Sequence, residues 1–155
     1  MTGMVAGKVA IVTGAGRGVG EEIARLFHAS GARVAVSDID GQAARQLADR
    51  LDDSGVSAMA LTLDVRSKRA FEDARDRIAS AWGRTDIVVN NAGIGLLGGA
   101  EESTMAQAKA IFDVNVFGVM RMTNAVLPVM RRQHGGRIVN LSSILGLIPS
   151  PLKFT

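Results

Sequence analysis

The chain reads TGAGRGVG over residues 13–20, and this glycine-rich stretch decides how the fold is interpreted. The apolar run at 9–12 before it is typical of a buried strand. The apolar residues at and after its end recur at helix spacing: Val19, Ile23, Leu26 and Phe27. A strand that turns into a helix through glycines places free N–H groups where a ligand's phosphates can bind. The stretch predicts a phosphate-binding loop or, as the alternative, a tight turn without a ligand.

The spacing of this loop is T-G-x-x-x-G-x-G. It differs from G-x-G-x-x-G because Val19 stands where the last glycine would be, and no Gly-Lys-Ser/Thr follows as in a P-loop. Its position after the first strand of a strand–helix–strand unit favours a ligand. The candidate cofactor-binding residues of the loop are Thr13, Gly14, Gly16, Arg17, Gly18, Val19 and Gly20.

Short apolar runs and helix-period segments alternate along the rest of the chain. Strands are predicted at 33–37, 58–63, 86–89 and 137–141. Helical stripes are predicted at Ala44, Leu47, Ala48 and Leu51; at Phe71, Ala74, Ile78 and Trp82 after a Ser67 cap; and from about 104 to 127, before Pro128. Strands that are apolar on both faces and alternate with helices predict an α/β fold: a parallel sheet covered by helices on each side.

Composition excludes several classes of protein. With 155 residues, 47% apolar and 21% charged, the chain is expected to form one ordered domain. The absence of cysteine excludes a disulfide scaffold, and no carboxylate–histidine spacing suggests a metal site. The scattered charges and net charge of +3 argue against nucleic acid. No apolar stretch is judged long enough to span a membrane and no signal peptide is recognised, so a cytoplasmic protein without a membrane partner is expected.

Asp38 follows the second predicted strand, 18 residues after Gly20, with Ile39 beside it. A carboxylate there can accept both hydroxyls of an adenosine ribose and would repel a 2′-phosphate, which favours NAD over NADP. The alternative is a helix N-cap, a role for which Asp40 competes. Arg17 favours the opposite preference, since its guanidinium could pair with a phosphate.

Four more segments follow in a fixed order. Asp64 and Val65 come after the third strand; NNAG occupies 90–93, DVN occupies 113–115 with Gly118 after it, and GRIVNLSS occupies 136–143. With the glycine loop, these motifs resemble the short-chain dehydrogenase/reductase family over the whole length of the chain. The resemblance implies a Rossmann-like doubly wound parallel sheet with strand order 3-2-1-4-5.

The resemblance also implies roles for individual residues. Asp64 would contact the adenine ring, and further cofactor contacts would come from Val65, Asn91, Ala92 and Gly93. Asn115 and Ser143 would be catalytic: the serine polarises a substrate carbonyl and the asparagine supports a water relay. Asn115 is expected to be buried, with an amide satisfied by the backbone as the alternative, and Ser142 or Ser143 could instead cap a turn.

The chain departs from the family at one point. In the family a tyrosine follows the serine after a dozen or so residues, with a lysine four further on; this sequence contains no tyrosine, and Lys153 is not a substitute. Residues 1–155 are therefore expected to be the NAD(P)-binding part of a dehydrogenase for a small alcohol or ketone, lacking the C-terminal strands and helices. A dinucleotide-binding module without chemistry and an interaction fragment remain the alternatives.

The long helix at 104–127 carries more apolar residues than one packing face requires. Between 105 and 130 the only charged residues are Lys109, Asp113 and Arg121. The surplus predicts a second buried contact, and the corresponding helix of the family joins subunits, which implies a homodimer or homotetramer. The fifth strand is also expected to present an open edge.

Overall fold

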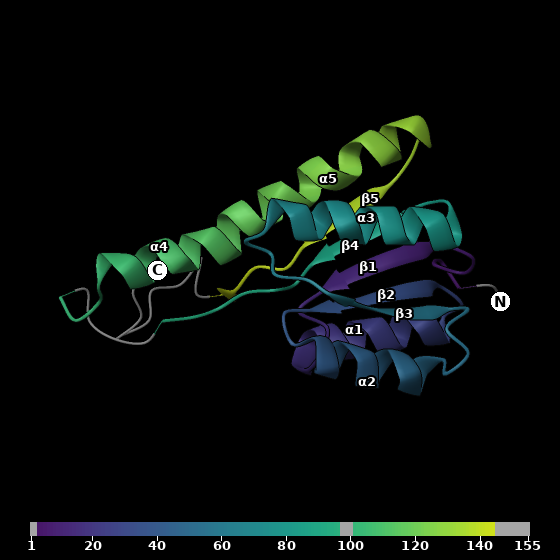
Figure 1. Ribbon diagram of the computed structural model, residues 1–155, viewed down its shortest axis with the longest axis horizontal. Helices are drawn as coiled ribbons and strands as arrows, with labels where there is room; N and C mark the ends of the chain where they lie inside the picture. Colours follow the sequence, from purple (N-terminus) through teal and green to yellow (C-terminus); the bar gives the residue numbers. More distant parts are fainter. Residues whose placement is uncertain (1–2, 97–100, 145–155) are drawn as a thin grey trace.

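Five parallel strands form the centre of the molecule in a computed structural model that describes residues 3–96 and 101–144 (Figure 1). The strands are β1 (Val9–Thr13), β2 (Arg33–Asp38), β3 (Ala58–Thr62), β4 (Ile87–Asn90) and β5 (Arg137–Asn140). They lie in the order β3-β2-β1-β4-β5, and every adjacent pair is parallel. The predicted fold class and strand order are both confirmed.

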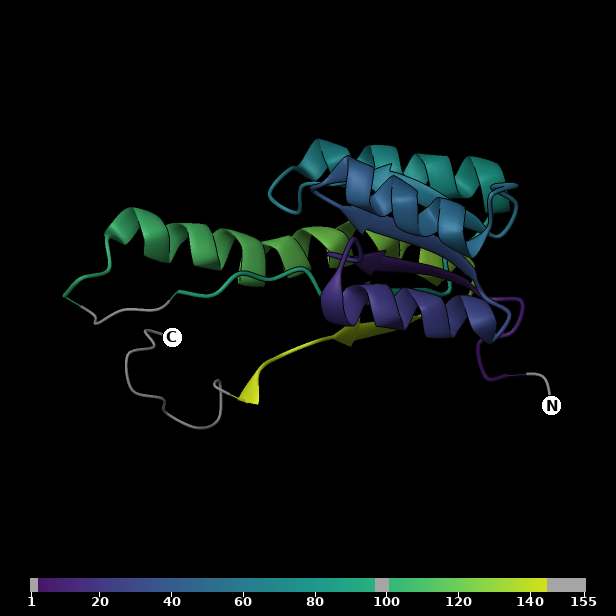
Figure 2. The ribbon, with the colours of Figure 1, turned by 90° about the horizontal axis from the view of Figure 1, so that it is seen from below.

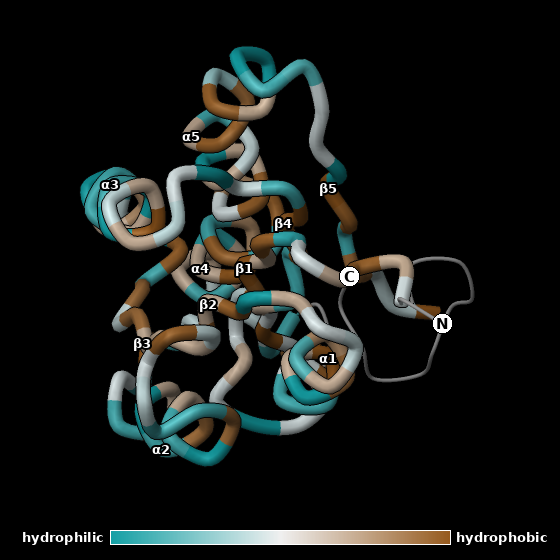
Figure 3. Tube along the Cα trace, turned by 90° about the vertical axis from the view of Figure 1, so that its right-hand side faces the viewer, coloured by the Kyte–Doolittle hydropathy of each residue, from teal (hydrophilic) through white to brown (hydrophobic). Residues whose placement is uncertain are grey.

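Helices cover both faces of this sheet (Figures 1 and 2). One layer holds α1 (Gly18–Ala29) and α2 (Gly41–Leu51), and the other holds α3 (Lys68–Trp82) and α5 (Gly118–Arg132). Each layer buries its own apolar cluster against the strands, and Figure 3 shows hydrophobic strand segments between the helices. Ser67 caps α3 as predicted, because its Oγ accepts from the Ala70 N–H at 3.2 Å.

The long helix contains a π-helical turn and extends further than the sequence predicts. It comprises α4 (Met105–Phe112), a π-helical turn η1 (Asp113–Phe117) and α5, and it continues past Pro128 to Arg132. Proline removes a helical hydrogen bond and normally ends or kinks a helix. Here Val126 and Met130 flank Pro128 and are both buried against the sheet. Packing therefore sustains the helix where local propensity predicts its end.

The predicted stripe of α1 is correct only in part. Val19 and Leu26 are 63% and 64% exposed, whereas Gly20 and Ala24 are buried. A Cβ on Gly20 would collide with the carbonyl oxygen of Gly14, so a glycine here allows α1 to begin directly against the loop. The helix therefore places its smallest residues closest to the core, and Ile23 and Phe27 of the predicted stripe pack, partly buried, against the same core cluster.

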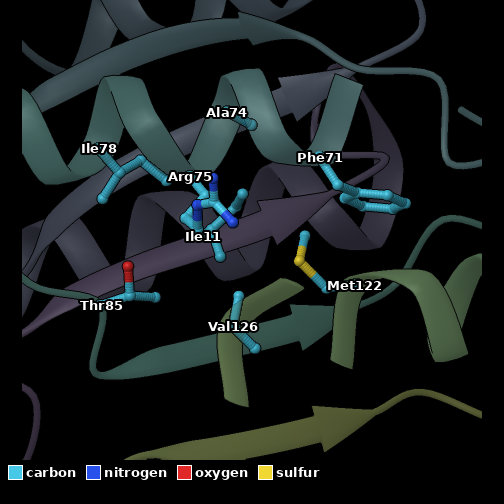
Figure 4. A pocket seen from close by; sticks show the side chains of 8 residues that line it. All are labelled: Ile11, Phe71, Ala74, Arg75, Ile78, Thr85, Met122 and Val126. Carbon is cyan, nitrogen blue, oxygen red and sulfur yellow. The ribbon is translucent and has the colours of Figure 1, made fainter. Parts of the chain in front are cut away.

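The layer formed by α3 and α5 is closely packed. Figure 4 shows the side chains around its small cavity, of about 10 Å³: Ile11, Phe71, Ala74, Arg75, Ile78, Thr85, Met122 and Val126. A space of this size holds at most one water molecule. This cavity therefore has no room for a ligand.

The continuous helical stretch Met105–Arg132 is long and apolar enough, by length and composition alone, to cross a membrane. The expectation that no stretch would qualify is wrong by this criterion. A core helix can pass the same test, and the C-terminal half of this one packs on the sheet through Met122, Val126 and Met130. However, 17% of its most apolar window is buried, so much of its apolar surface faces outward.

Candidate functional site

A cleft of about 420 Å³ opens where the loops after β1, β2, β3 and β4 meet. Its lining residues are Gly14, Arg17, Asp38, Ile39, Leu63, Asp64, Val65, Arg66, Asn91, Ala92, Gly93, Ile94 and Val114. The carboxyl ends of parallel strands meet at this edge, beside the point where the strand order reverses between β1 and β4. Open α/β sheets bind their ligands at such a position.

Most residues predicted to bind a cofactor lie on this cleft, although their sequence positions are far apart. Thr13, Gly16, Gly18, Val19 and Gly20 of the glycine loop are not among the lining residues. Sequence reasoning missed Leu63, Arg66, Ile94 and Val114. Three of these directly adjoin a predicted motif residue in the chain, which is the signal that could have found them; Val114 lies within the DVN motif itself.

The glycine loop has a conformation that other residues would strain. Gly14 and Gly18 both have φ of +62°. A Cβ on Gly14 would lie 2.9 Å from the Ala92 Cα, so the loop after β1 and the loop after β4 pack backbone to backbone. Space beside Gly18 is open. The turn thus leaves the start of α1 accessible to a ligand.

Thr13 and Asn91 hold these two loops together. The Thr13 Oγ1 accepts from the N–H groups of Asn91 and Ala92, each at 3.0 Å. The Asn91 Nδ2 donates to the carbonyls of Thr13 at 2.8 Å and Gly14 at 3.0 Å. Thr13 is buried and does not line the cleft, so its role in this structure is to hold the loop after β4 in place.

Asp38 is 8% exposed and lies on the cleft wall. Its Oδ2 accepts from the Gly16 N–H and its Oδ1 from the Asp40 N–H, both at 2.9 Å. Asp40 is the residue that caps α2, because its carboxylate accepts from the N–H groups at positions 42 and 43. Asp38 is therefore not the helix cap, and each of its oxygens keeps a lone pair for a ligand hydroxyl.

Asp64 and Arg66, which follow β3, form a bidentate ion pair on the cleft. The Arg66 Nη2 donates to Oδ2 of Asp64 at 2.7 Å and its Nε donates to Oδ1 at 2.9 Å. The hydrogen bond from the Arg66 side chain lowers the pKa of Asp64, although partial burial opposes this effect. Any ligand group that approaches Asp64 therefore meets a guanidinium beside the carboxylate.

Asn115 lies in the π-helical turn and is exposed, so the expectation that it is buried is wrong. Its carboxamide is satisfied by the backbone, as the alternative anticipated: Oδ1 accepts from the Ile94 N–H at 2.9 Å, and Nδ2 donates to the Ile94 carbonyl at 2.8 Å. Asn115 thereby holds the loop after β4, which lines the cleft. Ser143 is exposed just beyond β5, and Lys153 lies outside the described residues.

The residues on the cleft fit a dinucleotide. The glycine turn reaches the cleft at Gly14 and Arg17, beside the start of α1, where phosphates commonly bind. Asp38 offers an acceptor to a ribose, and Leu63, Val65 and Ile94 offer apolar surface to a ring. Within residues 3–96 and 101–144, no group of three His, Cys, Asp or Glu side chains is placed to hold a metal ion.

Comparison with known proteins gives consistent matches. The family model described as short chain dehydrogenase matches residues 8–154. The oxidoreductase UcpA of Salmonella typhimurium is 40% identical over 144 residues, which cover 93% of this chain and 54% of that protein. The 7alpha-hydroxysteroid dehydrogenase of Escherichia coli is 38% identical over 141 residues, covering 89% of this chain and 54% of that protein. The chain thus spans about half the length of the curated relatives it matches.

Two solved structures are also similar. One is a 7 alpha-hydroxysteroid dehydrogenase complexed with NADH and 7-oxo glycochenodeoxycholic acid, with a TM-score of 0.88 and 36% identity over 94% of this chain and 57% of that one. The other is a 3-ketoacyl-(acyl-carrier-protein) reductase from Brucella melitensis complexed with NADH, with a TM-score of 0.90 and 34% identity over 96% of this chain and 62% of that one.

Proposed function

The chain belongs to the short-chain dehydrogenase family, and from this premise we propose that it binds NAD(H) for hydride transfer between the cofactor and a small alcohol or ketone. The observation that carries the proposal is the cleft at the carboxyl edge of the sheet, with Asp38 on one wall and a glycine turn at its base. The names of the similar hydroxysteroid dehydrogenase and ketoacyl reductase support this class of reaction.

The residues of the chain divide the binding task among them. The backbone of the glycine turn would receive the pyrophosphate, Asp38 the adenosine ribose, and the wall formed by Asp64 and Val65 the adenine ring. When bound, the nicotinamide ring accepts or delivers the hydride. Ser143 would donate a hydrogen bond to the carbonyl oxygen of the substrate, and Asn115 would keep the loop at Ile94 in place.

Asp38 and Arg17 favour different cofactors. Both line the cleft, but Asp38 is nearly buried and fixed by two backbone N–H groups, whereas Arg17 is exposed. A fixed carboxylate repels a 2′-phosphate at short range, while water screens an exposed guanidinium. We therefore expect NAD(H) to bind more tightly than NADP(H).

A module that binds the dinucleotide without chemistry is the second candidate. The 155 residues contain no tyrosine, so the proton-transfer residue that the family resemblance implies is not among them. Residues of this chain would then supply cofactor binding only.

Distorting the glycine loop beside the cleft tests the proposed function. A Cβ on Gly16 would lie 2.8 Å from the Ala43 Cβ and 3.0 Å from Oδ2 of Asp38, so Gly16→Val should displace the loop and abolish NADH binding in fluorescence titration. Gly135→Val is the matched control, because the space around Gly135 is open. Thermal unfolding checks that both variants fold. Equal NADH affinity for wild type and a folded Gly16→Val variant would exclude the site.

We also propose that the protein associates through the helix at 104–127. Phe112, Val116, Phe117 and Met120 are all between 42% and 55% exposed on this helix. That amount of contiguous apolar surface supports a second buried contact, and a homodimer or homotetramer is the arrangement that the family resemblance implies.

A further inference from the structure

One guanidinium connects the wall of the cleft to the π-helical turn. Arg121 Nη1 donates to the Val65 carbonyl at 3.3 Å and to the Asp113 carbonyl at 3.1 Å, and its Nη2 donates to Asp113 Oδ1 at 2.6 Å. The Arg121 side chain is 28% exposed. A planar guanidinium with donors in fixed directions suits such a multiple contact, and a lysine ammonium does not.

The turn that Arg121 holds is an unusual one. In η1 the Gly118 N–H bonds to the Asp113 carbonyl, five residues back, and no side chain caps its start. Single π turns within α-helices are rare and occur often at functional sites. Arg121 donates to this same carbonyl, so it stabilises the residue at which the wide turn begins. Asn115 lies two residues further along this turn.

The same turn is packed tightly against the cleft wall. A Cβ on Gly118 would lie 3.1 Å from the Val65 Cβ and 3.3 Å from the Val65 carbonyl oxygen, so a larger residue here would push Val65 away by a few tenths of an ångström. Val65 lines the cleft, and so does Ile94, which Asn115 binds through two hydrogen bonds. A continuous series of contacts therefore connects Val65 to Ile94 through Arg121 and the π-helical turn.

We propose that Arg121 is a positioning residue that fixes the π-helical turn against Val65 and so sets the place of Asn115 and of the loop at Ile94. Arg121 is not among the residues that line the cleft. It follows that a ligand on the Val65 wall and the loop at Ile94 stabilise each other. This last step rests on the proposed dinucleotide site, whereas the role of Arg121 in holding the turn does not.

Hydrogen–deuterium exchange at the Ile94 amide tests the role of Arg121, because this N–H bonds directly to Asn115. In the full natural protein without ligand, Arg121→Gln should accelerate exchange at Ile94 by about 10-fold, the effect of losing one charge-assisted contact. Amides of β2 in the core should keep their rates. Arg131→Gln, on the exposed end of the same helix, should leave Ile94 unchanged. An unchanged Ile94 rate in folded Arg121→Gln would overturn the proposal.

Two further exchange measurements, on a second variant and with added ADP-ribose, separate a local effect of Arg121 from a loss of stability of the whole fold. Arg121→Gln could accelerate exchange at all amides together, and in that case Asp113→Asn is measured instead. This variant weakens the ion pair of Asp113 with Arg121 but keeps the hydrogen bond from Arg121 to the Val65 carbonyl. Local acceleration at Ile94 in this variant supports the proposal, and uniform acceleration overturns it. Added ADP-ribose should slow Ile94 exchange in wild type and do so less in Arg121→Gln. If wild type binds neither ADP-ribose nor NADH, the proposed function is wrong. The exchange rates of the Ile94 amide in ligand-free wild type and Arg121→Gln still test the role of Arg121 in that case.

Discussion

Asp38 illustrates how position gives a single carboxylate its role. It stands at the end of β2, two residues before the cap of α2, and two backbone N–H groups fix its orientation. The neighbouring Asp40 has the same side chain but supports the helix instead. Two aspartates two positions apart thus take different places: Asp38 lines the cleft, and Asp40 caps α2.

Asp38→Ala should relax the cofactor preference. Loss of charged hydrogen bonds to the ribose should weaken NAD(H) binding by about 10-fold, and removal of the negative charge should improve NADP(H) binding. Isothermal titration calorimetry with both cofactors measures the ratio. Asp40→Ala is the control: it should cost about 1 kcal/mol of helix-cap stability and leave the preference intact. Tighter NADP(H) binding by the unmodified chain would mean that Arg17 governs selection.

Asp86 predicts part of the acid sensitivity of the fold. Burial by itself would raise the pKa of Asp86, but hydrogen bonds from Arg84 and from the Val9 N–H outweigh it and leave the pKa below its ordinary value of 3.8. A carboxyl whose pKa is lower in the folded state stabilises the fold above the unfolded pKa, and this contribution is lost as pH falls through the folded pKa. Urea unfolding should show Asp86→Asn less stable than wild type near neutral pH, with the difference shrinking below about pH 4. A difference that stays constant with pH would contradict this assignment.

At the scale of elements, the long helix from α4 to α5 packs against different parts of the molecule along its length. Its C-terminal half packs on the sheet, its π turn contacts the loops after β3 and β4, and its N-terminal half extends past the sheet (Figure 2). The ion pair of Asp113 and Arg121 connects the π-helical turn to α5. One continuous helix thus joins the core to the cleft.

The packing of α5 predicts unequal effects for two methionines on this helix. Met122 is 2% exposed between Phe71 and Val126, whereas Met120 is 55% exposed. Met122→Ala should lower the free energy of unfolding by about 2–5 kcal/mol, because it enlarges a cavity that the neighbours cannot fill. Met120→Ala should change it by less than about 0.5 kcal/mol. Chemical denaturation of both variants measures the difference, and equal effects would show that α5 does not pack as described.

On the scale of the whole molecule, two surfaces are left without a neighbour among the described residues. One is the apolar side of the helix at 104–127, and the other is β5, which pairs with β4 alone in the part of the chain that the structure describes. An unpaired strand edge invites pairing with another chain. Both surfaces lead to the expectation that the isolated chain self-associates or aggregates.

Sedimentation of two charge variants tests this association. Phe117 is 47% exposed within the apolar surface, so Phe117→Glu should weaken self-association by placing a charge in the contact. Lys109→Glu changes one of the three charged residues of the helix at 104–127 and should have the smaller effect. A well-folded monomer across micromolar concentrations would instead show that the apolar helix surface is covered within one chain.

Activity is the second property of the molecule as a whole. We expect the isolated 155-residue chain to have negligible dehydrogenase activity, because it contains no tyrosine and a missing proton-transfer group costs about 100- to 10,000-fold in rate. Turnover of alcohols with NAD by the purified chain measures this directly. Robust turnover would mean that another residue of this chain transfers the proton.

The sequence by itself determined the layered parallel sheet, the glycine turn after the first strand and Asp38 at the sheet edge, while the resemblance to the family added Asp64 and Asn91. It could do so because burial periodicity and turn chemistry are local, and because parallel strands bring their carboxyl ends to one edge. Only the tertiary structure decided that Val19 faces outward, that α5 continues through Pro128 and that Asn115 is exposed. It alone showed Arg121 bridging Asp113 and Val65. These features depend on how closely one helix approaches a particular strand or loop, and contacts between residues dozens of positions apart leave no period in the sequence.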